Sequence, residues 1–252
     1  MPKFFFSPND ANDGFVHISG EAAHHLLHVL RIKPDDEVTL CDGLETDYHA
    51  EFIESSSKAK QAVAVFRIKS TSPCDTEPLT RVTLFQSLPK GDKMDLIIQK
   101  CVELGVYEIR PVLTERSVAR INTKDAAKKT ARFQKIAESA AGQSNRGIIP
   151  IIHPPRDFSA VIEDIKANPA ALTLLAYEQE YERSLKSVLL NHIAPQKNIS
   201  LWIGPEGGFT GNEVAALCDT GAIHITLGRR VLRAETAAIA AISQIICLCE
   251  DA

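Results

Sequence analysis

Residues 199–213 read ISLWIGPEGGFTGNE, and this stretch contains the parts of one α/β unit in order. Ile199–Ile203 is an apolar run with β-branched residues, which predicts a buried strand. Three glycines follow within residues 204–208 and predict a loop whose backbone can approach a ligand closely or adopt positive φ. Thr210 and Glu213 then match a capping box, which predicts the first turn of a helix. A strand, a glycine-rich loop and a helix are the repeating parts of an α/β layer.

The same alternation extends along most of the chain. Further strands are predicted at residues 81–88, 106–112, 148–152, 172–177 and 223–227. Asp92–Leu104 has apolar residues at helical spacing, with an Asp at its expected N-cap and Gly105 after its end. We therefore expect an α/β fold with a mainly parallel sheet over residues 73–252.

The segment before residue 73 shows a different pattern. Strand-like runs with period-two alternation occur at residues 4–6, 15–18, 37–41, 48–53 and 62–68. A short helix is expected at Glu21–Leu30, and Ser70–Pro78 is polar with two prolines, which is typical of a linker. We expect a small β-barrel or sandwich over residues 1–72 and a domain boundary in this linker.

The composition is that of an ordinary globular protein, with 252 residues, 44% hydrophobic, 24% charged and a formal net charge of -4. This composition excludes an intrinsically disordered chain. No apolar stretch approaches the length of a bilayer span, and the start of the sequence lacks the layout of a signal peptide, so we expect a cytoplasmic protein without a membrane segment. Six cysteines without a C-x-x-C motif indicate buried free thiols.

One part of the chain is strongly basic. From Arg110 to Arg146 it has nine Lys and Arg residues against three acids. Such a run fits either a solvated helical face or a surface that contacts nucleic-acid phosphates. His24 and His28 lie four residues apart, but no third ligand accompanies them at suitable spacing, so no metal site is expected.

Two loops after late strands are the candidate ligand-binding segments, because ligands of open α/β sheets bind beyond the carboxyl ends of the strands. Residues 204–208 match neither common phosphate-binding motif, and Glu206 would place a negative charge beside a phosphate. This acidic loop fits a ligand with cationic or hydroxyl groups, or it is only a tight structural turn. Residues 227–236 contain three arginines before an apolar helix. These arginines could bind an anion or an RNA backbone. The alternative is that they are merely exposed.

Six motifs occur in order along the chain: KGDKM (90–94), KCVELGV (100–106), ERS (115–117), QSNR (143–146), GPEGG (204–208) and LGRRVLRAETA (227–237). Together with HHLLHVLR at residues 24–31, they closely resemble the RsmE family. Members of that family are SPOUT-superfamily methyltransferases that methylate N3 of a uridine in small-subunit ribosomal RNA. The resemblance extends over essentially the whole chain.

The resemblance implies a PUA-like β-barrel RNA-binding domain at residues 1–72 and an α/β methyltransferase domain with a C-terminal trefoil knot at residues 73–252. It also implies a homodimer that uses S-adenosylmethionine. The implied cofactor pocket contains Leu175, Ala176, Gly204, Pro205, Glu206, Gly207, Leu227, Gly228, Val231, Leu232 and Arg233. Two positions depart from the family pattern: Ala234 stands where Thr is more frequent, and Asn145 stands where Gly is more frequent but still tolerates a left-handed backbone.

The implied reaction suggests roles for charged residues. Uridine N3 is a weakly acidic imide nitrogen and a poor nucleophile while protonated. Glu206 and Glu235 are the candidates for accepting or relaying its proton, and Arg233 is the candidate for stabilising negative charge on the uracil oxygens. Because N3 is hidden in a Watson–Crick pair, the target base must be unpaired or extruded.

The expected partner is small-subunit ribosomal RNA in the assembled subunit. Residues expected to contact its phosphates are Arg31, Lys33, Arg116, Arg120, Lys124, Lys128, Arg132 and Arg146. Two other hypotheses stay open on the residues alone. One is a non-catalytic RNA-binding protein whose glycine loop is only structural. The other is a small-molecule phosphotransferase, which the missing phosphate loop and Glu206 disfavour.

Overall fold

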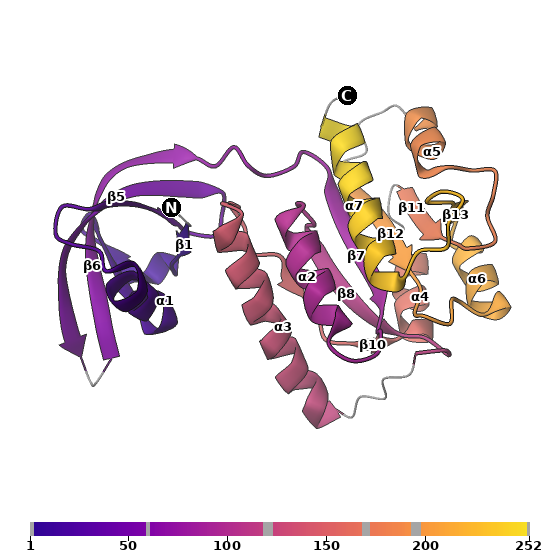
Figure 1. Ribbon diagram of the computed structural model, residues 1–252, viewed down its shortest axis with the longest axis horizontal. Coiled ribbons are helices and arrows are strands. Elements are labelled where there is room, and N and C mark those ends of the chain that lie inside the picture. Colours follow the sequence, from indigo (N-terminus) through magenta and orange to yellow (C-terminus); the bar gives the residue numbers. More distant parts are fainter. Residues whose placement is uncertain (1–2, 59–60, 118–122, 168–171, 193–197, 251–252) are drawn as a thin grey trace. The chain divides into compact units, whose positions relative to one another are not determined.

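The computed structural model describes residues 3–58, 61–117, 123–167, 172–192 and 198–250. The chain forms two compact units (Figure 1). The first consists of Met1–Glu77 with Ala141–Ile149, and the second consists of Pro78–Ala140 with Pro150–Ala252. Each unit contains its own sheet.

The first unit is built on a six-stranded sheet with the strand order β1-β4-β5-β6-β3-β2. Its strands are β1 (Phe4–Phe5), β2 (Ala11–Asn12), β3 (Phe15–Ser19), β4 (Glu37–Cys41), β5 (Thr46–Lys58) and β6 (Gln61–Pro73), with a short 3-10 helix η1 (Pro8–Asp10) before β2. All neighbouring pairs are antiparallel except β1 and β4. The core contains Leu26, Leu40 and Phe66, all fully buried. The predicted strands are confirmed, and β5 and β6 are longer than expected.

The predicted helix at Glu21–Leu30 is present, but its winding changes partway. α1 (Gly20–His24) continues into a wider π-helical segment, η2 (His25–Leu30). Arg31 ends this segment in the left-handed region, with φ of 55°. Leu26 anchors the helical segment because its side chain is fully buried in the core of the first unit.

The predicted linker starts too early in the sequence. Ser70–Pro73 are the last residues of β6, and they pair with Thr46–His49 of β5. The polar composition of these residues does not prevent strand formation, because the backbone groups of β5 need a partner and a strand needs only one buried face.

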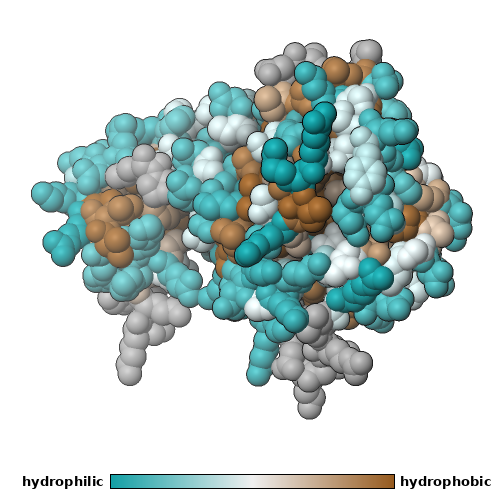
Figure 2. Space-filling view, turned by 45° about the vertical axis from the view of Figure 1, so that its right-hand side comes forward, coloured by the Kyte–Doolittle hydropathy of each residue, from teal (hydrophilic) through white to brown (hydrophobic). Residues whose placement is uncertain are grey.

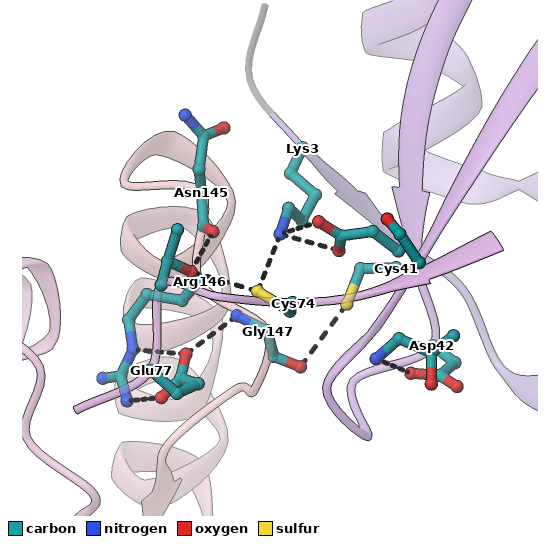
Figure 3. A network of polar contacts seen from close by, with 12 residues as sticks. Lys3, Cys41, Asp42, Cys74, Glu77, Asn145, Arg146 and Gly147 are labelled. Carbon is teal, nitrogen blue, oxygen red and sulfur yellow. Dashed lines mark hydrogen bonds and ion pairs between the residues drawn. The ribbon is translucent and has the colours of Figure 1, made fainter. Parts of the chain in front are cut away.

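A polar network within the first unit holds the segment Ala141–Ile149 (Figure 3). The Glu77 carboxylate accepts hydrogen bonds from Arg146 Nη2 at 2.6 Å and Arg146 Nε at 3.1 Å. It also accepts one from the backbone N of Gly147 at 2.8 Å. Gly147 packs so tightly that a Cβ at this position would lie 2.7 Å from Cys74 Sγ.

Arg146 is therefore not available for the phosphate contact that the sequence analysis expects. Its side chain is only 3% exposed and is paired with Glu77. A guanidinium that is buried and bound to a carboxylate supports the fold, because moving it to solvent would leave the carboxylate unpaired. Asn145 has φ of 58°, so its expected left-handed backbone is confirmed.

The second unit contains a parallel sheet with the strand order β10-β8-β7-β12-β11-β13, and β9 also pairs with β8. The strands are β7 (Arg81–Ser87), β8 (Glu108–Leu113), β9 (Ile151–Ile152), β10 (Arg156–Asp157), β11 (Leu172–Ala176), β12 (Asn198–Ile203) and β13 (Ile223–Ile225). The helices are α2 (Lys93–Glu103), α4 (Phe158–Ala167), α5 (Leu185–Asn191), α6 (Gly211–Cys218) and α7 (Ala234–Glu250). The last residues of α3 (Thr123–Gln143) are counted with the first unit. The predicted parallel α/β fold is confirmed.

Helices cover both faces of this sheet (Figure 1). α2 and α7 lie side by side on one face, and α4 and α6 lie on the other. The apolar helix predicted after residue 236 is α7, whose Ala238, Ile242 and Ile245 are fully buried. In the core, the Trp202 ring of β12 stacks on Phe85 of β7 with 4.5 Å between ring centroids. This packing fixes the strand that leads into the glycine-rich loop.

All six cysteines are free, as predicted, but the prediction that they are buried is wrong for most of them. Cys41 and Cys101 are buried, whereas Cys218 and Cys247 are exposed. Cys247 follows the buried Ile245 and Ile246 on α7, and helical periodicity turns its side chain away from them.

Among the described residues, no helix is both long and apolar enough to cross a membrane. The face shown in Figure 2 is mostly hydrophilic, with separate apolar patches.

Candidate functional site

Three loops meet beyond the carboxyl ends of β11, β12 and β13. In that order, they span residues 177–184, 204–210 and 226–233. The three strands are parallel neighbours, so their carboxyl ends lie at the same edge of the sheet. The loops surround a cavity of about 550 Å³, which lies in the size range of small-molecule sites.

Most residues expected in the cofactor pocket line this cavity: Ala176, Gly204, Pro205, Glu206, Leu227, Gly228, Val231, Leu232 and Arg233. Leu175 and Gly207 do not line it. Leu175 is fully buried in the hydrophobic core with Trp202, because successive strand residues point to opposite faces. Gly207 faces Arg116 instead, and a Cβ at position 207 would lie 3.4 Å from that side chain.

The glycine-rich loop is both a tight turn and a wall of the cavity. Gly208 has φ of 67°, and its backbone N donates to the carbonyl oxygen of Pro205 at 2.9 Å. A Cβ on Gly208 would lie 2.4 Å from Glu178 Oε1, so the loops after β11 and β12 approach closely here. The predicted capping box is confirmed: Thr210 N donates to Glu213 Oε2 at 2.8 Å, and Glu213 N donates to Thr210 Oγ1 at 3.3 Å.

Arg116 ties the loop after β8 to the glycine-rich loop. Its Nη1 donates to the carbonyl oxygens of Gly207 at 2.8 Å and Phe209 at 3.4 Å. The neighbouring Glu115 N donates to Glu213 Oε1 at 2.8 Å. The sequence predicts that Arg116 contacts RNA phosphates. A guanidinium carries five N–H donors, so a phosphate contact is compatible with the loop contact that the structure shows.

The arginine-rich loop brings its cationic side chains to the cavity. Arg229, Arg230 and Arg233 are exposed and line it. At the start of the loop, Gly228 N donates a hydrogen bond to Thr226 Oγ1 at 3.2 Å. Gly228 has φ of 121°, a conformation that other residues rarely adopt. The three arginines are thus both exposed and part of the cavity wall, so a ligand or RNA contact stays a prediction.

Lys93 bridges the two carboxylates that the sequence analysis selects for proton transfer. Its Nζ donates to Glu206 Oε1 at 2.6 Å and lies 3.8 Å from Glu235 Oε2. Partial burial raises the pKa of Glu206, but hydrogen bonds from the Lys93 side chain and from two backbone N–H groups lower that pKa below its ordinary value. Glu235 does not line the cavity itself, although Ala234 and Ala237 beside it do.

The cavity is also lined by residues that were not predicted from the sequence, among them Lys93, Glu178, Glu180, Tyr181 and Thr226. Glu180 holds its loop in shape: its carboxylate accepts hydrogen bonds from the backbone N–H groups of Glu182 and Arg183, which lower its pKa to about 2. The Tyr181 side chain is 81% exposed beside this turn. Only Lys93 carries a sequence signal, because it lies in the KGDKM motif.

The residues expected to contact RNA lie on several elements. Arg31 and Lys33 are exposed after η2 in the first unit. Lys128 and Arg132 are exposed on α3, where Arg132 forms an ion pair with Asp95. Arg120 and the side chain of Lys124 lie outside the described residues.

The fold is that of an RNA methyltransferase domain joined to a PUA domain. A family model described as an RNA methyltransferase domain matches residues 75–246, and one described as an RNA methyltransferase PUA domain matches residues 18–65. The ribosomal RNA small subunit methyltransferase E of Bacillus subtilis is 34% identical, over 90% of this chain and 88% of its own. The chain belongs to the ribosomal RNA small subunit methyltransferase E family, as the resemblance predicts.

Solved structures agree with this assignment. The ribosomal RNA small subunit methyltransferase E of Neisseria gonorrhoeae, bound to S-adenosyl methionine, is 33% identical with a TM-score of 0.81, and the match covers 98% of both chains. A Legionella pneumophila methyltransferase in complex with the same cofactor is 30% identical with a TM-score of 0.82, and the match covers 96% of both chains. The predicted combination of a PUA-like domain and an α/β methyltransferase domain is confirmed.

Proposed function

We propose that this protein transfers a methyl group from S-adenosylmethionine to N3 of a uridine in small-subunit ribosomal RNA. One observation carries the proposal: the three loops implied by the family resemblance surround a single cavity of about 550 Å³ in the methyltransferase unit. Family membership and the two cofactor-bound relatives support the choice of cofactor. We also propose the homodimer, the trefoil knot and the assembled subunit as substrate.

The residues around the cavity fit this cofactor. The glycine-rich loop would bring its backbone close to the cofactor, and a side chain at Gly208 would instead collide with Glu178. Carboxylates of Glu178 and Glu206 lie in the wall, and carboxylates suit a ligand that carries an ammonium and a sulfonium group. When bound, S-adenosylmethionine supplies an electrophilic methyl group. Residues proposed to hold it are Ala176, Gly204, Pro205, Glu206, Leu227, Gly228, Val231, Leu232 and Arg233.

The chain's own residues have two tasks in this reaction. The first is to hold N3 in line with the methyl carbon, since orientation supplies much of the catalysis of such displacements. The second is to remove the N3 proton and stabilise the charge that develops on the uracil oxygens. Glu206 or Glu235 would serve as acceptor, and Arg233 at the cavity would face the oxygens. We propose that Arg31, Lys33, Arg116, Arg120, Lys124, Lys128 and Arg132 contact RNA phosphates.

The test is transfer of radiolabelled methyl from S-adenosylmethionine to purified small ribosomal subunits that lack uridine methylation, followed by nucleoside mass spectrometry. We expect labelled 3-methyluridine. Subunits that already carry the modification are the matched control and should accept no label. A different methylated nucleoside would contradict the uridine N3 assignment. Binding of RNA without any transfer would favour the non-catalytic RNA-binding protein. Naked ribosomal RNA, run in parallel, tests whether the assembled subunit is required.

Arg116→Ala is expected to weaken the binding of S-adenosylmethionine by roughly tenfold. The substitution removes a charge-assisted hydrogen bond worth about 1.5 kcal/mol, which holds the carbonyl group of Gly207 in the loop that lines the cavity. Isothermal titration calorimetry measures the affinity, because Trp202, the single tryptophan, is buried in the core and does not line the cavity.

Arg156→Ala is the control for this prediction. Arg156 forms an exposed ion pair with Asp164 and does not line the cavity, so cofactor affinity should stay unchanged. Equal affinities in Arg116→Ala and the wild type would mean that the loop keeps its shape without the Arg116 contact.

A further inference from the structure

Three carboxylates line the cavity, and the structure engages two of them in contacts within the protein. The Glu180 carboxylate accepts a hydrogen bond from the backbone N of Arg183 at 3.1 Å and forms an ion pair with its side chain at 2.9 Å. Glu206 Oε1 accepts a hydrogen bond from Lys93 Nζ at 2.6 Å. The third carboxylate, that of Glu178, is exposed and makes no hydrogen bond or ion pair with any described residue. Its negative charge is therefore open to a ligand in the cavity.

The loop that carries Glu178 is fixed at both ends. Just before Glu178, Tyr177 N donates to the carbonyl oxygen of Ile225 at 3.1 Å. At the far end of the loop, Thr226 N donates to the carbonyl oxygen of Arg183 at 2.8 Å. A loop that is held in this way loses little conformational freedom when a ligand binds, so its side chains bind at a lower entropic cost.

Gly208 provides the space that the Glu178 carboxyl group occupies. A Cβ at position 208 would lie 3.1 Å from Glu178 Cδ and 3.3 Å from Glu178 Oε2. Gly208 also has φ of 67°, in the left-handed region. Glycine meets both conditions without strain, because it has no side chain. The Glu178 carboxyl group therefore lies directly against the glycine-rich loop, in the wall of the cavity.

S-adenosylmethionine offers three kinds of group to such a carboxylate: an ammonium, a sulfonium and the ribose hydroxyls. An ammonium carries both a full charge and three N–H donors. A sulfonium has a charge but no donor, and a hydroxyl has a donor but no charge. Because charge-assisted hydrogen bonds are about twice as strong as neutral ones, the ammonium is the best partner. The cofactor's own carboxylate, on the same carbon, suits the arginines of the cavity wall, Arg229, Arg230 and Arg233.

We propose that Glu178 forms an ion pair with the ammonium group of S-adenosylmethionine and so selects ligands that carry an amino-acid end. This inference rests on the proposed function, which places the cofactor in this cavity. Glu178 is thus a specificity-determining residue of the cofactor site and takes no part in proton transfer. An adenine nucleotide has phosphates in place of the amino-acid end, and the Glu178 carboxylate repels them.

The test measures the binding of three ligands to Glu178→Gln and to the wild type by isothermal titration calorimetry. S-adenosylmethionine carries both cationic groups, S-adenosylhomocysteine keeps the ammonium without the sulfonium, and 5′-methylthioadenosine lacks the whole amino-acid end. In Glu178→Gln we expect the first two to bind about tenfold more weakly, which is the usual loss when a hydrogen bond between charged groups is weakened. The affinity for 5′-methylthioadenosine should stay at the wild-type value, which also shows that the cavity remains folded.

Each other pattern of affinities overturns the proposal. A loss for S-adenosylmethionine alone would assign Glu178 to the sulfonium. An equal loss for all three ligands would assign Glu178 to the ribose or to the shape of the loop. No loss for any ligand would mean that the Glu178 carboxylate stays solvated when the cofactor binds.

Glu182→Gln is the matched control. Glu182 is an exposed glutamate of the same loop that does not line the cavity, so its substitution should leave the binding of all three ligands unchanged. Equal losses in Glu182→Gln and Glu178→Gln would show a general effect of charge and would overturn the ion pair. The proposed function fails separately: a wild type that binds none of the three ligands would contradict the cofactor site itself. A wild type that binds S-adenosylmethionine keeps that site, whatever Glu178→Gln shows.

Discussion

Arg146→Met is expected to lower the free energy of unfolding of the first unit by about 3–5 kcal/mol. Arg146 is 3% exposed, and its partner Glu77 is 11% exposed, so the substitution leaves a carboxylate without its cation in a largely dry environment. Glu77 keeps the backbone donors of Gly147 and Ile148, but these do not neutralise its charge. Urea denaturation followed by far-ultraviolet circular dichroism measures the loss.

Two comparisons make the result specific. Arg132→Met removes an arginine that is 50% exposed and paired with Asp95, and exposed pairs contribute at most about 1 kcal/mol. Trp202 lies in the second unit, so in Arg146→Met the urea midpoint followed by its fluorescence should stay near the wild-type value. The urea midpoint followed by circular dichroism should fall to a lower urea concentration. Equal losses in Arg146→Met and Arg132→Met would show that the buried pair contributes little.

The α/β unit quoted from residues 199–213 was predictable because each of its parts is determined locally. The apolar run of β12 and the capping box at Thr210 depend on neighbours within a few residues. Two of the three loops around the cavity could also be placed at one edge of the sheet, because ligands of such sheets bind beyond the carboxyl ends of parallel strands. The loop after β11 was placed beside them only by the family resemblance.

Contacts between distant segments could not be predicted in this way. Arg146 is one of nine basic residues in its segment, and only the folded chain shows that it meets Glu77. Leu175 was placed in the pocket by the family resemblance, but strand alternation turns it into the core. Lys93 was recognised as part of a motif, yet its partners lie far along the chain, one in the loop after β12 and one at the start of α7. Side-chain pairing across long sequence separations leaves no periodic trace in the sequence.

Glu235→Gln is expected to slow methyl transfer by about 10²–10⁴-fold under single-turnover conditions with saturating cofactor, which is the usual effect of losing a general base. Glutamine keeps nearly the size of glutamate but cannot accept the N3 proton. The Glu235 side chain is only 13% exposed at the start of α7, beside Ala234 and Ala237 in the cavity wall. Cofactor affinity, measured by isothermal titration calorimetry, should change little because Glu235 itself does not line the cavity.

Glu206→Gln is the matched substitution, and we expect it to impair cofactor binding more than the rate of methyl transfer. Glu206 lines the cavity and is bound by Lys93, so its loss should weaken cofactor binding while the rate at saturating cofactor falls less than tenfold. If instead Glu206→Gln loses the rate and Glu235→Gln keeps it, the proton goes to the carboxylate nearer Lys93. The lowered pKa of Glu206 argues against that outcome, because a base that stays ionised in acid has little tendency to take a proton from an imide nitrogen. The two variants therefore distinguish a carboxylate that binds from one that accepts the proton.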